Sequence, residues 1–186
     1  GRYGLALAVR YLQAFENATA QSDAFNHQPA HACAGVAVVK VHYPFARAYR
    51  LSEALCDGAK EQVREWVDAK LVENDASALD WQFAISGITG TLGQIRNREY
   101  AVRLMSENAR LYTRPLLLRE TGATWRTWPV METMIKELVN PGGGWFGRRN
   151  KVKALREALR RGPEAVTEFL RTYRLLGEER QEKGLP

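Results

Sequence analysis

One strand–helix–strand run constrains the fold of this chain more than any other part of its sequence. Residues 32–41 are apolar without alternation apart from Lys40, which predicts a buried strand covered on both faces, as central strands are. Pro44 ends this strand, and apolar side chains spaced by three and four then predict an amphipathic helix over residues 45–72. Alternating residues at 79–86 predict a second strand. The run therefore indicates an α/β fold.

Three further segments complete the expected first domain, residues 1–125. Residues 3–20 predict a helix with one apolar face, and residues 94–112 carry a weak helical pattern. Residues 113–119 predict an edge strand, because Pro115 is costly in a central one. The apolar stripe expected on the helix at 45–72 is Phe45, Tyr49, Ser52, Cys56, Ala59, Val63 and Trp66, and the face expected at 3–20 is Leu5, Ala8, Leu12 and Phe15.

The rest of the chain, residues 126–186, predicts a helical domain. Helices are expected over residues 129–139, over 150–161, and from Pro163 to about residue 176. Gly162 followed by Pro163 is typical of one helix ending and the next beginning. Domains of these sizes fit a chain of 186 residues.

Composition and cysteine usage are those of an ordinary globular protein. Hydrophobic residues make up 45% of the chain and charged residues 26%, and no apolar run approaches the ~18 residues that span a bilayer. No membrane partner is therefore expected. Cys33 and Cys56 form no CxxC pair and no disulfide framework, so we expect a reducing, cytoplasmic location.

Several familiar sites are disfavoured by the spacing of their residues. His27, His31, Cys33 and Cys56 are zinc-type ligands, but Pro29 breaks the histidine pair and a second ligand pair is missing. A G-x-S-x-G nucleophile is absent, and Cys33 lies in an apolar run where thiols are usually inert. The glycine-rich stretches match neither a Walker loop nor a dinucleotide-binding loop.

Positive charge is concentrated near the C-terminus. The net charge of +6 divides into +1 for residues 1–125 and +5 for residues 126–186. A basic segment beside Trp145 and Phe146 is typical of a surface that follows a phosphate backbone and stacks bases, although a solvated helix face with core aromatics explains it equally well. The candidate contacts for nucleic acid or a partner are Arg148, Arg149, Lys151, Lys153, Arg156 and Arg160, with Arg161 beside them.

The segment at 32–60 also resembles a known family. Its strand A-C-A-G-V-A-V-V-K-V-H-Y-P and the helix that reaches Ala59-Lys60 resemble the second palm domain of the large subunit of type III CRISPR effector complexes. Leu79-Asp80-Trp81 and Thr113-Arg114-Pro115 are similar to later elements of that family, and residues 150–162 to its downstream helical region. The likeness covers most of the chain and is most specific at 32–60.

The resemblance implies a fold and an activity for the parent protein. The fold would be the C-terminal half of a ferredoxin-like palm, followed by a helical domain. In the family, a Gly-Gly-Asp-Asp turn holds Mg²⁺ or Mn²⁺, and ATP is converted to cyclic oligoadenylates in antiviral defence. Two metals bridge the attacking and leaving oxygens in such transfers. The expected partners are ATP and the protein subunits and guide RNA of an effector complex.

This sequence contains neither Gly-Gly-Asp nor Asp-Asp. In family order the turn precedes the helix expected at 3–20, so we expect the sequence to start just after the catalytic hairpin; a degenerate relative is the alternative. Neither of the two expected domains should then contain catalytic or metal-binding residues, and the chain alone should be inactive. By resemblance, Lys60, Cys33 and Ala34 lie near the nucleotide, and Lys60 would act as a point charge on phosphate.

A second function class stays open beside the enzyme. A non-catalytic palm-like module that binds nucleic acid or assembles with other subunits fits the same residues. The sequence directly upstream of Gly1 discriminates between the two, because the catalytic turn belongs only to the enzyme.

Overall fold

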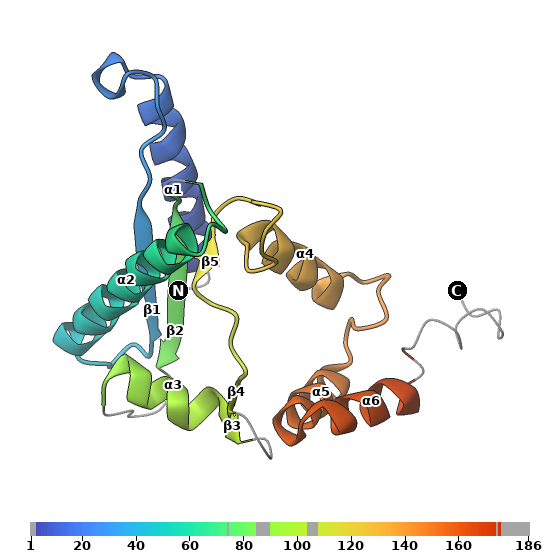
Figure 1. The fold of residues 1–186 in the computed structure, drawn as a ribbon. Coiled ribbons are helices and arrows are strands. Elements are labelled where there is room, and N and C mark those ends of the chain that lie inside the picture. The colour runs from blue at the N-terminus through green and yellow to red at the C-terminus, as the bar shows by residue number, and fades with distance from the viewer. Residues whose placement is uncertain (1–2, 74, 85–89, 104–107, 174, 176–186) are drawn as a thin grey trace. The chain divides into compact units, whose positions relative to one another are not determined.

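A computed structural model gives the fold of this chain, which is mixed α/β (Figure 1). The structure describes all residues except 1–2, 74, 85–89, 104–107, 174 and 176–186. Two compact units divide the chain: Gly1–Ile95 with Thr113–Thr133, and Arg96–Tyr112 with Met134–Pro186. The predicted boundary at residue 125 between a palm and a helical domain stays a prediction.

A three-stranded sheet lies at the centre of the first unit. Its strands are β1 (Cys33–Val39), β2 (Ala78–Ala84) and β5 (Leu116–Leu117), in the order β1-β2-β5. β1 and β2 are parallel and β5 is antiparallel to β2. The predicted strands are confirmed in position, but β2 rather than β1 is the central one of these three. Residues 85 and 86 of the second predicted strand lie outside the described residues.

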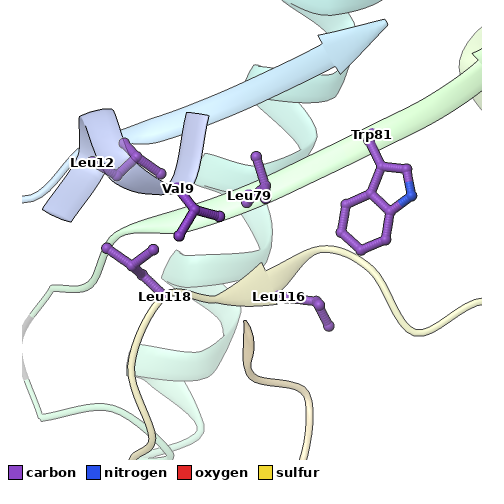
Figure 2. Packing of buried hydrophobic residues seen from close by; sticks show 6 residues of the cluster. All are labelled: Val9, Leu12, Leu79, Trp81, Leu116 and Leu118. Atoms are coloured by element: carbon purple, nitrogen blue, oxygen red, sulfur yellow. The ribbon is translucent and has the colours of Figure 1, made fainter. Parts of the chain in front are cut away.

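Helices α1 (Gly4–Ala20) and α2 (Phe45–Asp68) cover the two faces of this sheet (Figure 1). α1 follows the predicted bounds closely and packs Val9 and Leu12 against Leu79 and other side chains of β2 and the β5 segment. Figure 2 shows this cluster: Val9, Leu12, Leu79, Trp81, Leu116 and Leu118. The strand β1 is thus covered on both faces, as the absence of alternation predicted.

The α2 face of the sheet is divided into two apolar clusters. Ala59, Val63 and Trp66 of α2 pack with Ala78 of β2, whereas Leu51 and Leu55 pack with Ala84 at the other end of the strand pair. The side chains of one β-strand alternate between its faces, so Cys33 faces α2 while Ala34 packs in the α1 cluster.

The predicted stripe of α2 is wrong in its first half. Phe45 and Tyr49 are 81% and 54% exposed, and the buried positions there are Leu51 and Leu55. Leu51 and Leu55 continue the i, i+4 series of Ala59 and Val63 toward the N-terminus, and their branched side chains fill the space over β1 and β2. The second half of the stripe, from Ala59 to Trp66, is confirmed.

Gly35 explains how closely α2 lies on β1. A Cβ atom at this position would lie 2.1 Å from the carbonyl oxygen of Ser52 and 2.4 Å from the backbone nitrogen of Cys56. Both atoms belong to the helix backbone, so a side chain cannot be accommodated by rotating a neighbour. The glycine inside the apolar run is therefore a packing requirement of the strand–helix pair.

The second unit contains a small hairpin and the C-terminal helices. β3 (Ala101–Arg103) pairs antiparallel with β4 (Asn108–Arg110), where a weak helical pattern was expected to run to residue 112. α3 (Leu92–Tyr100) and α4 (Trp128–Val139) each have residues in both units. α5 (Arg149–Arg161) and α6 (Pro163–Thr172) meet at Gly162, as predicted. α6 ends four residues earlier than expected, and residues 176–186 lie outside the described part of the chain.

Candidate functional site

The predicted nucleotide-binding residues are only partly brought together. Cys33 faces α2 and interacts electrostatically with Lys60, which lies on the exposed side of that helix. Ala34 points to the opposite face of the sheet, into the cluster around Leu12. Cys33 and Lys60 thus lie on the α2 side of the sheet, whereas Ala34 lies on the other side.

Lys60 is held by a neighbour on its own helix. Its Nζ lies 3.2 Å from Oδ1 of Asp57, and this hydrogen bond raises the pKa of Lys60. Both side chains are more than half exposed, and exposed pairs of this kind are weak. The ammonium can thus exchange Asp57 for another anion at little cost.

Burial keeps the Cys33 thiol protonated. Burial raises the pKa of Cys33 to about 11, and the thiol of Cys56 donates to the carbonyl oxygen of Cys33 at 3.3 Å. A thiol in this state is a poor nucleophile and a poor metal ligand at neutral pH. Both cysteines are free.

The histidines of the zinc alternative each contact a different carboxylate. His27 lies 3.1 Å from Asp23, the first residue of a short 3₁₀ helix (Asp23–Phe25), whereas His31 lies 3.3 Å from Glu16. Within the described ranges, no three His, Cys, Asp or Glu side chains gather closely enough to hold a metal ion.

A buried carboxylate that the sequence analysis missed organises the far end of the first unit. Glu16 of α1 is 1% exposed, and Nε of Arg119 donates to its Oε2 at 2.6 Å. Ser77 and His31 also hydrogen-bond to it. Burial alone raises the pKa of Glu16, but the hydrogen bonds from Ser77 and Arg119 and the charge of Arg119 outweigh it, so the pKa lies below the usual 4.5.

The Glu16 cluster borders a cavity of about 540 Å³, but its geometry is structural rather than catalytic. A Ser–His–acid triad needs the histidine between serine and acid. Here the carboxylate is the common partner of Ser77 and His31, and Ser77 Oγ accepts the backbone N–H of Ala32 at 3.1 Å. The cluster therefore ties α1, the segments before β1 and β2, and Arg119 together.

A second buried polar group lies within β2. Asp80 and Gln82 are fully buried, so the apolar–polar alternation of this strand does not separate core from solvent. Nη2 of Arg114 donates to Oε1 of Gln82 at 2.8 Å, and Nε of Arg114 lies 3.8 Å from Oδ1 of Asp80. The Arg114 guanidinium also lies 5.6 Å from the ring centre of Trp81. These contacts join the segment before β5 to the central strand.

The residues of the predicted basic surface lie on or directly before α5, and all but one of them are exposed. Lys151 is 8% exposed, and its Nζ lies 4.8 Å from the ring centre of Trp145 and 5.3 Å from that of Tyr173. It therefore belongs to the packing of the second unit, and Trp145 is engaged with it. The exposed basic residues are Arg148, Arg149, Lys153, Arg156, Arg160 and Arg161.

Two of these arginines have partners within the second unit. Arg156 donates to Glu157 at 2.9 Å, and Arg160 donates to the carbonyl oxygen of Glu99 at 3.3 Å. Together with Arg149 and Lys153 they share one helical face at spacings of three and four. Such a face can follow a phosphate backbone by exchanging Glu157 for phosphate.

No protein-family model matches the chain, and neither does any curated protein sequence. Among the described residues, no helix is both long enough and apolar enough to cross a membrane.

Proposed function

We propose that this chain is the C-terminal half of a palm domain followed by a helical domain, in a nucleotidyltransferase that converts ATP to cyclic oligoadenylate. The parent would be the large subunit of a type III CRISPR effector complex. The proposal rests on the resemblance of residues 32–60 and on one structural observation, the open outer edge of β1.

β1 pairs along one edge only within the described residues. All seven of its residues pair with β2, and the opposite edge meets no described strand. An apolar strand with an open edge is unfavourable in water and is normally paired or covered. The outer edge of the strand therefore offers hydrogen-bonding groups to a further partner.

Both helices carry exposed apolar side chains on the flank beside this edge. On α2, the stacked rings of Phe45 and Tyr49, 6.3 Å apart, precede Ser52 and Cys56, whose backbone lies against β1. On α1, Leu7 and Tyr11 follow Gly4, which lies beside Val36 of β1, at helical spacing. Apolar side chains on both sides of an open edge favour a sheet that continues there.

We assign that continuation to the strands of the Gly-Gly-Asp-Asp hairpin, outside these 186 residues. The described residues do not fit a site for Mg²⁺ or Mn²⁺, because they contain no cluster of three ligating side chains. No step through a metal is therefore assigned to this chain. In the parent protein the metals would activate and stabilise the oxygens of phosphoryl transfer.

The chain's own contribution to ATP would be Lys60. Its ammonium is exposed, is paired only weakly with Asp57, and lies on the same side of the sheet as Cys33. A lysine in this state can supply a point charge to a phosphate. Cys33 would form part of the wall, because its thiol stays protonated.

The alternative, a non-catalytic palm-like module that binds nucleic acid or assembles with other subunits, is favoured by the exposed basic face of α5. Arg149, Lys153, Arg156 and Arg160 form this face without any need for an adjacent catalytic turn. Such a module would keep the palm fold without the metal-binding carboxylates of the catalytic turn.

The test begins with the residues encoded upstream of Gly1. A Gly-Gly-Asp-Asp turn there supports the enzyme, and its absence supports the module. In the complete protein, Lys60→Ala should weaken ATP binding several-fold, measured by isothermal titration calorimetry. Arg64→Ala, an exposed cation one turn further along α2, is the matched control and should leave ATP binding unchanged. Equal affinity in wild type and Lys60→Ala removes this residue from the site.

A further inference from the structure

A cleft of about 570 Å³ lies between the first turns of α2 and the start of α3, within the first unit. Its walls include Tyr43, four residues after the end of β1, and Gly90, which follows β2 in the chain. The cleft is therefore found near the carboxyl ends of two parallel strands. Open α/β sheets commonly bind ligands at that edge.

The charge of the cleft is positive. Arg47 and Arg50 line it from adjacent turns of α2, and none of the lining residues is Asp or Glu. Both arginines are exposed, and in the described part of the chain neither forms an ion pair with a carboxylate. Two neighbouring guanidinium groups without an acidic partner are suited to bind a phosphate group.

The floor of the cleft is apolar. Leu51 and Ile95 are buried beneath it, and Leu92 and the ring of Tyr43 are half-buried at its sides. A nucleotide base has an apolar face that packs on aromatic and aliphatic side chains of this kind. The cleft volume is also within the range of small-molecule sites, ~300–1,000 Å³.

The α3 wall is fixed by its own hydrogen bonds. The backbone N–H of Thr91 donates to Oε1 of Gln94 at 2.9 Å, and the N–H of Gln94 donates to Oγ1 of Thr91 at 3.3 Å. This reciprocal capping holds the start of the helix in place. The oxygens of the Thr91 and Gln94 side chains accept these two bonds, so the donors left to face an anion are the two arginines, the Thr91 hydroxyl proton and Nε2 of Gln94.

From these features we infer that the cleft binds a nucleotide, with its phosphate on Arg47 and Arg50 and its base against Tyr43 and Leu92. The nucleotide is either free or part of a single-stranded RNA. The inference does not depend on the proposed palm activity. Lys60 interacts with Cys33 at the start of β1, whereas this cleft lies beyond the end of that strand.

The test uses the full chain, two probes and a charge-matched control. One probe is AMP, measured by calorimetry, and the other is a fluorescein-labelled RNA of eight uridines, measured by anisotropy across salt concentrations. The variant is Arg47→Gln with Arg50→Gln. The control is Arg64→Gln with Arg10→Gln, two exposed arginines outside the cleft. Circular dichroism melting verifies that each variant stays folded.

We expect the cleft variant to bind at least one probe about tenfold more weakly. It should also lower the salt slope for RNA by about 0.7, since the two arginines share one phosphate and each phosphate neutralised on a single strand contributes about 0.7. Weaker binding of RNA alone indicates that the site binds single-stranded RNA. Weaker binding of AMP as well indicates that it binds free nucleotides. The inference is overturned if both probes bind the cleft variant within twofold of wild type, or if the control loses as much. If the cleft variant fails to fold, NMR of the wild-type protein decides between the outcomes. Backbone amide signals of Leu51, Leu92 and Ile95 should shift when AMP or RNA is added, and the absence of shifts at all three overturns the inference.

Discussion

Nε of Arg119 lies 2.6 Å from Oε2 of Glu16, so one ion pair joins two residues that are 103 positions apart in the chain. Glu16 also accepts hydrogen bonds from Ser77 and His31. Three segments that the sequence separates widely thus share one buried carboxylate.

Replacing this carboxylate should destabilise the first unit. Glu16→Ala removes the acceptor of Ser77, His31 and Arg119, and polar groups that lose their partner cost about 1–3 kcal/mol each when buried. We expect a loss of about 2–3 kcal/mol in the free energy of unfolding, measured by urea denaturation, because Arg119 is largely exposed and regains water. Asn17→Ala, on the exposed side of the same helix, should change little. Equal stability of both variants would contradict the role given to Glu16.

The buried carboxylate of Glu16 also predicts that the stability of the protein depends on pH. The pKa of Glu16 is lower in the folded protein than its ordinary 4.5, so the folded state favours the ionised form. This stabilisation is complete above the unfolded pKa and is lost as the pH falls from about 4.5 through the folded pKa. The unfolding free energy should drop over this range in wild type, and by less in Glu16→Gln. Parallel pH profiles for the two proteins would show that Glu16 does not contribute.

Gly35 offers a sharp test of the contact between β1 and α2. Gly35→Ala places a methyl group against the backbone of Ser52 and Cys56, and overpacking of this kind costs about 3 kcal/mol. Gly58→Ala is the control within α2, because a Cβ atom there meets nothing within 4 Å. It should stabilise the helix by about 0.5–1 kcal/mol. Thermal unfolding that moves both variants in the same direction would contradict the packing described.

Arg114 should contribute strongly to the stability of the first unit. Arg114→Met leaves the carboxylate of Asp80 buried and without this guanidinium, and breaking a buried charged pair costs about 3–5 kcal/mol. Arg114→Lys keeps a positive charge and should lose less. Denaturant midpoints for the two variants measure the difference. Wild-type stability in Arg114→Met would show that the buried polar group is not organised by this arginine.

The basic face of α5 predicts salt-dependent binding of RNA. Neutralising Arg149, Lys153 and Arg156 to Gln should lower the slope of log affinity against log salt by about 2, at about 0.7 per contact with a single strand. Arg171→Gln, on α6, is the control. An unchanged slope in the triple variant identifies the face as a solvated surface. Lys151 is left in place, because it packs against Trp145 and Tyr173.

The strand–helix–strand run could be predicted because its apolar pattern is long and its ends are marked by Pro44 and polar loops. The first half of the α2 stripe could not. Two series, one through Phe45 and Tyr49 and one through Leu51 and Leu55, satisfy helical spacing equally and meet at Ala59. The strands on which the helix packs decide which series is buried, and the sequence of the helix itself does not contain that information.

The buried polar groups were missed for a related reason. Glu16 follows Leu12 by four residues, on the face expected to be apolar, and this mismatch was the only local signal. Its partner Arg119 lies more than a hundred residues away. Asp80 and Gln82 alternate with apolar side chains as solvent-facing residues do, and one partner that compensates their burial, Arg114, comes from a distant segment.

The proposed palm is tested most directly by turnover of ATP. The protein extended through the residues encoded upstream, in its effector complex with guide and target RNA, should convert radiolabelled ATP with Mg²⁺ or Mn²⁺ to cyclic oligoadenylate, separated by thin-layer chromatography. The 186-residue chain alone should form none. An extended protein that leaves ATP unchanged under these conditions, and whose upstream segment supplies no strand to the outer edge of β1, would contradict the account.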